Sequence, residues 1–548
     1  MLALPAAATG AQQPDSATVL RRARDAQSRF EFTRRQNLPF GGSGSHPCDA
    51  YIGRFCYWHE PPDDRPPAPP PEEPEAIRRA RARLLAALDS VAAVLPGDAW
   101  IAGQRVRYLL EADRGADAIA AAGACRAASW WCAALAGLAL HVSGDYTAAE
   151  SAFTRSLGDM PAEQRCRWTD ISLLLEEDLG RRYERADCDA RIAMAERIWW
   201  LAQPLYSLPA NDRRTEHFAR RTMARIGEDG RSPYAVRWRD DLTELTLRYG
   251  WPTHWTRTQV PPGSMREPTI TGHGPEPGFH FFPESADSHP AWDLEAVRPR
   301  ERHAPAYATA FVALPHQVGV FRRGDSCLVV AAFDVGADTG FTRVPPHAAL
   351  VVTQDERHPP VIARSDSAAT TGRFVATSSC ASQLVSLELV ARDARRAARA
   401  RLAYSSPVAV DNLAISDILL FRPPPSLPEQ LDGVLPHLHG SASLRRPGSL
   451  GLYWEVYGVA AHETLNLSVT VTPERAGWLR RATTALGLTQ RRAATHIEWQ
   501  ELAEVEDGRA ARSLVLDLRG LPSGSYRIEV AALGRGRAVA RRDITIER

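Results

Sequence analysis

The chain has 548 residues, which is too long for one hydrophobic core and indicates several domains. A net charge of +1 disfavours broad electrostatic binding to nucleic acid or anionic lipid. All 66 basic residues are arginine, which excludes sites that need lysine, such as a P-loop, a Schiff base or a kinase-type ATP site. No apolar run approaches the roughly 18 to 20 residues that span a bilayer.

Residues 1–11 resemble the end of an export signal. An apolar run from Leu2 is followed by small residues up to Ala11, which is typical of a signal h-region and its cleavage site. A positively charged segment does not precede the run, so we expect Met1 to lie inside a longer signal peptide; a short unstructured tail is the alternative. The pattern predicts an exported protein, periplasmic or extracellular.

Cysteine usage agrees with export. The eight cysteines fall into neighbouring pairs, which favours structural disulfides in an oxidising compartment, with buried free thiols as the alternative. No CxxC motif occurs, which disfavours a zinc ribbon or thioredoxin-like redox chemistry. The predicted pairs are Cys48–Cys56, Cys125–Cys132, Cys166–Cys188 and Cys327–Cys380.

Residues 12–75 show little periodicity and predict a loop and a linker. A disulfide between Cys48 and Cys56 would close a short loop. Residues 61–73 are rich in proline and acidic residues, which is typical of an extended polyproline-II spacer.

Residues 76–230 predict an α-helical domain built from repeats. Two units, Trp100–Arg126 and Trp131–Leu157, each place an aromatic residue, a glycine turn and an alanine-rich second helix, displaced by about thirty residues. The second unit resembles a tetratricopeptide repeat, with the matching residues Leu135, Gly137, Leu138, Gly144, Asp145, Tyr146, Phe153 and Pro161. Because one helical pair cannot bury its apolar face alone, we expect the units to stack, with Leu135, Leu138 and Phe153 between them.

Paired tryptophans mark a candidate contact surface on these helices. In Trp130-Trp131 and Trp199-Trp200, one member can face the core while its neighbour faces a groove. Exposed aromatic residues on a repeat surface would contact a protein partner, whereas core packing is the alternative. The candidate contact residues are Trp130, Trp199 and Trp200.

Residues 231–258 carry a recognisable motif. Trp238 and Asp240 or Asp241 stand at its opening, and Arg248-Tyr249-Gly250 with Pro252 stands at its close. This segment resembles the GWxTD-domain proteins of bacteria, whose signature runs from a tryptophan through an acidic residue into a short strand ending Arg-Tyr-Gly-Pro. The resemblance implies a strand here, a β-rich C-terminal part and no established chemistry.

The C-terminal half predicts two β-sandwich domains, so the fold class is multidomain α + β. Residues 259–305, rich in proline, glycine and histidine, predict a linker. Residues 306–425 contain short strand candidates separated by turn residues, which predicts the first sandwich. Residues 440–548 alternate as in an Ig-like sandwich, with Leu452 and Trp454 on one face and Tyr453 and Glu455 on the other.

Candidate chemistry is sparse. His254, His273, His280, Glu284 and His289 lie close in sequence, and imidazoles with a carboxylate suit zinc, yet no HExxH motif or helical histidine pair is present. We therefore predict a non-catalytic exported envelope protein, without a cofactor or bound nucleic acid, that binds protein partners or assembles through its helical repeats. The alternative is a metal-dependent hydrolase whose site, between the helical and first β domain, uses His273, His280 or Glu284.

Overall fold

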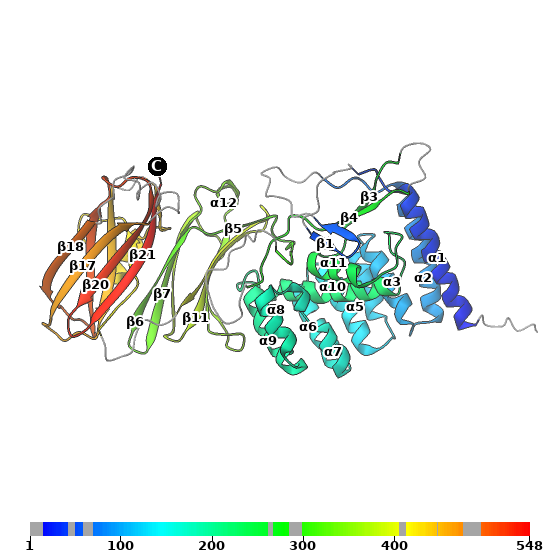
Figure 1. Cartoon of the computed structure of the whole chain (residues 1–548), viewed down its shortest axis with the longest axis horizontal. Coiled ribbons are helices and arrows are strands. Elements are labelled where there is room, and N and C mark those ends of the chain that lie inside the picture. The colour runs from blue at the N-terminus through cyan, green and yellow to red at the C-terminus, as the bar shows by residue number, and fades with distance from the viewer. Residues whose placement is uncertain are drawn as a thin grey trace, which may run out of the picture. The chain divides into compact units, whose positions relative to one another are not determined.

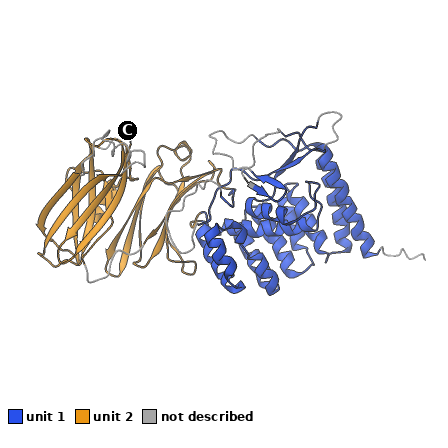
Figure 2. Cartoon of the chain, in the orientation of Figure 1, with its two compact units in different colours: residues 1–204, 208–286, 295–306 blue, residues 205–207, 287–294, 307–548 orange. Residues whose placement is uncertain are grey.

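The computed structural model describes residues 15–41, 50–57, 69–260, 267–283, 299–404, 413–445, 448–474 and 495–547. As predicted, a helical region is followed by a β-rich region (Figure 1). The chain forms two compact units (Figure 2): unit 1 comprises residues 1–204, 208–286 and 295–306, and unit 2 comprises residues 205–207, 287–294 and 307–548. Within the described ranges, no helix combines the length and the apolar character that crossing a membrane requires.

Unit 1 is mainly helical. Its helices are α1 Ser16–Asn37, α2 Glu75–Val94, α3 Ala99–Leu110, α4 Gly115–Gly123, α5 Ser129–Val142, α6 Tyr146–Asp159, α7 Ala162–Trp168, η1 Ser172–Leu174, α8 Glu177–Arg185, α9 Cys188–Ala202, α10 Asp212–Glu228 and α11 Asp240–Tyr249. Two short hairpins accompany them, β1 Ala50–Ile52 with β2 Phe55–Tyr57 and β3 His254–Arg257 with β4 Ile270–His273.

The predicted helical pairs are present. In the α5–α6 pair, Gly144 adopts a left-handed conformation (φ +83°) that ends α5, and the Asp145 carboxylate caps α6 by accepting from the Ala148 N–H at 3.0 Å. Leu135, Leu138 and Phe153 are buried, as the repeat pattern predicts. Local turn chemistry and an apolar seam therefore both specify this pair.

Helix α1 corrects the prediction of a loop in residues 12–75. Its buried residues recur every three or four positions, which is the helical period: Val19, Ala23, Gln27, Phe30 and Arg34. They join the core that contains Leu84 and Leu88 of α2. The pattern was missed because a glutamine and an arginine occupy two of the buried positions.

Helix α11 corrects the strand that the GWxTD resemblance implies. Residues 240–249 are helical, with Leu242, Leu247 and Tyr249 buried. The helix ends at Gly250, whose φ of +90° favours glycine. The chain then turns into β3.

Helix α10 packs against α3, α5 and α6. The Phe218 ring lies 5.7 Å from the Phe153 ring between centroids, and the Gln104 side chain donates to the Ile226 carbonyl at 2.9 Å. Helix α10 therefore covers part of the surfaces of α3, α5 and α6.

The described part of residues 259–305 packs into unit 1, which corrects the prediction of a linker. The His303 ring lies 3.0 Å from the Asp212 carboxylate, and the Arg213 guanidinium forms a 2.7 Å ion pair with Glu301. All four side chains are buried. These ion pairs and hydrogen bonds offset the cost of burying the charged groups. They join residues 301–303 to α10.

Unit 2 begins with two mainly antiparallel sheets that share one hydrophobic core. The three-stranded sheet has the order β10-β7-β6 and the five-stranded sheet has the order β5-β12-β11-β8-β9. The strands are β5 Ala310–Ala313, β6 His316–Arg323, β7 Ser326–Asp334, β8 His347–Thr353, β9 Val361–Ser365, β10 Thr371–Ser379, β11 Gln383–Ala391 and β12 Arg396–Tyr404, and the short helix α12 spans Thr339–Arg343. Side chains from both sheets form one hydrophobic cluster.

A second pair of sheets follows. One has the order β13-β16-β14 with β19 also on β16, and the other has the order β15-β21-β20-β17-β18. The elements are β13 Ala414–Ile415, β14 Leu419–Phe421, α13 Leu431–Val434, η2 Leu435–His437, β15 Ser443–Arg445, β16 Ser449–Tyr457, β17 Thr464–Pro473, β18 Thr495–Leu502, β19 Arg509–Asp517, β20 Gly524–Leu533 and β21 Arg537–Glu547. β13 and β14 were predicted in the 306–425 domain, but both pair with β16 and so belong to this sheet.

The predicted alternation of β16 is confirmed, with both faces buried. Leu452 and Trp454 join the core between the two sheets. On the other face, Tyr453 packs with Phe321 of β6 and Leu419 of β14. Arg323 donates two hydrogen bonds to the buried Glu455 carboxylate, at 2.7 and 2.8 Å.

Three of the predicted disulfides are confirmed. The Cα atoms of Cys125–Cys132, Cys166–Cys188 and Cys327–Cys380 are 5.6, 5.8 and 5.1 Å apart. These separations are ordinary for a disulfide. For the pair Cys48–Cys56, Cys48 lies outside the described residues.

Candidate binding pocket

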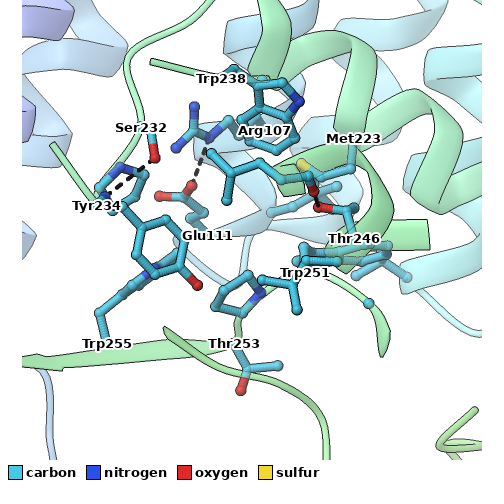
Figure 3. Close-up of a pocket in the computed structure, with 18 of the residues that line it drawn as sticks. Arg107, Glu111, Met223, Ser232, Tyr234, Trp238, Thr246, Trp251, Thr253 and Trp255 are labelled. Atoms are coloured by element: carbon cyan, nitrogen blue, oxygen red, sulfur yellow. Dashed lines mark hydrogen bonds and ion pairs between the residues drawn. The ribbon is translucent and has the colours of Figure 1, made fainter. Parts of the chain in front are cut away.

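A cavity of about 330 Å³ lies in unit 1. It is lined by the end of α3, by α10, and by the segment from Ser232 through α11 to Trp255 on β3. Figure 3 shows four aromatic side chains around it: Tyr234, Trp238, Trp251 and Trp255. The cavity therefore combines residues of the helices α3 and α10 with residues of the 232–255 segment.

Close packing against glycine fixes two of these aromatic walls. A Cβ on Gly227 of α10 would overlap the Trp238 ring, so only glycine admits that ring against the helix. The Trp238 indole N–H also donates to the Thr243 hydroxyl at 2.9 Å. In the same way, a Cβ on Gly272 of β4 would overlap the Tyr234 hydroxyl.

The other two walls follow from the turn at Gly250. Gly250, with φ +90°, ends α11, and Trp251 and Trp255, which follow it, both line the cavity. The Arg34 guanidinium lies 4.8 Å from the Trp255 ring centroid, within cation–π range. Within the described part of the chain, the Trp255 indole N–H has no hydrogen-bond partner.

A neutralised charge network forms the polar wall. Arg107 donates to Glu111 at 2.8 Å (Figure 3), and Glu111 also accepts from Arg34. Glu31 accepts from the Tyr108 hydroxyl at 2.7 Å and pairs with both arginines. Burial raises the pKa of Glu111, but the charges of Arg34 and Arg107 outweigh burial and lower it to about 2. The positive charges of the two arginines and the negative charges of the two glutamates in this network therefore cancel.

Asp113 adds an unbalanced charge at the cavity. It lies in the turn after α3 with φ +57°, a left-handed conformation that aspartate tolerates, and it is exposed. No hydrogen bond or ion pair to its carboxylate is found among the described residues. Because Arg107 and Glu111 cancel, the charged residues lining the cavity sum to −1.

The predicted metal residues have separate partners. The His273 ring stacks on His254, with centroids 4.4 Å apart and planes at 5°, and its Nε2 lies 2.9 Å from the Thr256 hydroxyl. His280 lies 3.0 Å from Glu301, which also binds Arg213. Glu284 lies outside the described residues. Within the described ranges, no three His, Cys, Asp or Glu side chains are grouped to hold a metal ion.

The predicted contact tryptophans also differ from one another. Trp199 is 2% exposed and packs against Phe282 and His217, so its prediction as a surface contact is wrong. Trp130 is half-buried, with its ring edge-on to Trp168 at 5.6 Å. Trp200 is half-buried beneath the Arg197 guanidinium at 4.5 Å.

The sequence did not identify the cavity's own tryptophans as contact residues; Trp238 was named only as part of the 231–258 motif. Trp238, Trp251 and Trp255 fall within 18 residues, which is a usable signal because 14 tryptophans are spread over the whole chain. The reason they converge is the α11 helix and the turn that follows it, where a strand had been expected.

No protein-family model matches the chain, and no curated protein matches it. Among solved structures, the chain is similar to red sea bream transglutaminase, at 10% identity and a TM-score of 0.15, over 43% of this chain and 31% of that one. It is also similar to the chicken CNTN1 FN1-FN3 domains, at 10% identity and a TM-score of 0.15, over 54% of this chain and 79% of that one. Likeness at this level carries no argument about fold or function.

Proposed function

We propose that this is a non-catalytic exported protein of the bacterial envelope that binds a protein partner through the cavity of unit 1. The observation that carries the proposal is the aromatic wall of Tyr234, Trp238, Trp251 and Trp255. Aromatic side chains at concave sites supply most of the binding free energy in many protein interfaces.

The cavity is a better candidate than the faces of the repeat helices. Faces of α3 and α5 that a partner could otherwise use are packed against α10, through contacts such as Gln104 to Ile226 and His141 to Glu216. The open space lies at the end of α3, where Arg107 and Leu110 meet the 232–255 segment.

The finer assignments of fold and location belong to the same proposal. The α3–α4 and α5–α6 pairs are a tetratricopeptide-like scaffold, the 231–258 segment is a GWxTD-like module, and the two pairs of sheets in unit 2 are Ig-like structural sandwiches. Three disulfides support residence in an oxidising compartment, periplasmic or extracellular.

Site-specific photo-crosslinking tests the proposal. A benzophenone amino acid at Thr253, which is exposed and lines the cavity, should form a discrete adduct in envelope extract. The matched control places the same group at Thr147, an exposed threonine at the start of α6 that does not line the cavity.

Two alanine variants sharpen the test. Trp251→Ala should abolish the Thr253 adduct, whereas Trp200→Ala, at a half-buried tryptophan away from the cavity, should retain it. Circular dichroism on both variants confirms that the helical unit is folded. An adduct that survives Trp251→Ala and disappears with Trp200→Ala would place the contact on α9 and overturn the proposal.

A further inference from the structure

We infer that the partner inserts a guanidinium group, the side chain of an arginine in an extended segment, into the cavity of unit 1. The inference rests on the proposed function and names the chemistry of the occupant. It stands on the cavity's size, its aromatic walls and its charge.

The size suits a side chain rather than a folded element. A space of about 330 Å³ is at the small end of ligand pockets and holds one or two side chains. An arginine side chain can place its aliphatic part against apolar surface while its charged group contacts polar atoms.

The walls suit a planar cation. Tryptophan faces attract cations through the ring quadrupole, and a guanidinium both stacks on them and donates hydrogen bonds. Unit 1 already uses this pairing: Arg34 lies 4.8 Å from the Trp255 centroid and 4.5 Å from the Phe30 centroid. A second guanidinium at Trp251 or Trp238 would extend the same packing.

The charge also favours a cation. Arg107 is committed to Glu111 and Glu31, so it is compensated and does not repel a positive occupant as a free arginine would. Asp113 remains exposed beside the cavity without a partner among the described residues. A bound arginine would supply that partner in bidentate geometry, whereas an anionic occupant would meet a net negative wall.

A peptide pair that differs only in charge tests the inference. The full-length protein is titrated with acetyl-Gly-Ser-Arg-Ser-Gly-amide and with the same peptide carrying citrulline, a neutral isostere of arginine, while tryptophan fluorescence is followed. We expect the arginine peptide to bind at least about tenfold more tightly, from one cation–π contact and one ion pair.

Matched variants locate the effect. Asp113→Asn keeps a residue that tolerates φ +57° and removes the charge, so it should reduce the arginine-to-citrulline discrimination several-fold. Asp117→Asn, at an exposed acid of α4 that pairs with Arg114 and does not line the cavity, should leave it unchanged.

The outcomes separate this inference from the proposed function. Equal affinity for the two peptides, no binding of the arginine peptide, or discrimination that survives Asp113→Asn would each overturn the inference. If the Thr253 adduct still depends on Trp251 in that case, the cavity binds a partner of other chemistry and the proposed function stands. If no Thr253 adduct forms, or if the adduct no longer depends on Trp251, both the inference and the proposed function fail.

Discussion

Gly137 of α5 lies directly against the ring of Phe153 of α6: a Cβ built on Gly137 would lie 2.6 Å from Phe153 Cε1. The two helices therefore approach more closely than any residue with a side chain would allow at that position. Phe153 also lies 5.7 Å from Phe218 of α10, between ring centroids, so one side chain joins three helices.

We predict that Gly137→Ala destabilises unit 1. Alanine in a helix normally stabilises by about 1 kcal/mol relative to glycine, but the clash with Phe153 costs about 1 to 3 kcal/mol. Urea unfolding followed by circular dichroism measures the difference. Gly158→Ala in α6, with no atom within 4 Å of its Cβ, is the control and should be neutral or stabilising. Equal effects of both variants would contradict the close approach.

The same contact predicts non-additive mutations. Phe153 is 1% exposed, so Phe153→Ala should cost about 3 to 5 kcal/mol through lost burial and a residual cavity. In the Gly137→Ala background, Phe153→Leu should cost less than it does alone, because the smaller side chain relieves the clash. Strictly additive free energies of unfolding would mean that the two residues do not touch.

Helix pairs of this kind could be predicted because their pattern is simple. In α5 and α6, small and apolar residues alternate at helical spacing and Gly144-Asp145 marks the turn. Strand β12, which buries two arginines, was missed. In β12, Arg399 and Arg401 are each 3% exposed, so a strand with a charged, inward-facing set does not show the apolar alternation that identifies strands.

The candidate site was missed for a different reason. Its walls come from α3, α10 and the 232–255 segment, and no local pattern reports that segments so far apart in sequence converge. Within the segment, the motif resemblance implied a strand where the helix α11 forms. Two residues predicted for a site have structural contacts instead. Trp199 is buried in the core, and His280 forms a hydrogen bond with Glu301.

We predict that Glu111→Gln is strongly destabilising. The substitution removes one of two carboxylates that balance Arg34 and Arg107, leaving a buried positive charge at a cost of about 3 to 5 kcal/mol. Chemical unfolding measures it. Glu163→Gln, which removes an exposed helical pair with Arg167, is the control and should cost less than about 1 kcal/mol. A similar small effect at Glu111 would mean that the network is solvated.

The pKa of Glu111 also predicts a pH dependence. Its pKa is about 2 in the folded protein and 4.5 for an ordinary glutamate, so the unfolded chain takes up the proton first as pH falls. The stabilisation is complete above about pH 4.5 and is lost as pH falls from there towards about pH 2. Stability curves measured across that range should be less steep for Glu111→Gln than for the wild-type protein. Parallel curves would contradict the lowered pKa.

The stacked pair His254 and His273 predicts a second pH effect. Burial lowers the pKa of both imidazoles, and the charge of His273 lowers that of His254 further. With both folded pKa values below 6.5, the stabilisation is present above about pH 6.5 and is lost as pH falls below it. NMR titration should place both transitions below pH 6.5, and His254→Phe should make stability less pH-dependent there. Titration of either ring above 6.5 would contradict the prediction.

The disulfides predict an oxidised mass and an order of stabilities. Without reductant, the intact protein should lack at least six hydrogens, two for each of Cys125–Cys132, Cys166–Cys188 and Cys327–Cys380. Because a longer closed loop restricts the unfolded chain more, the 53-residue separation of Cys327–Cys380 should contribute about 4 kcal/mol and the 7-residue separation of Cys125–Cys132 about 2 kcal/mol. Paired Cys→Ala variants, each followed through the unfolding transition of its own unit, measure both values. Four or more thiols that react with an alkylating agent in the protein recovered from its native compartment would contradict the pairing and weaken the proposal of export.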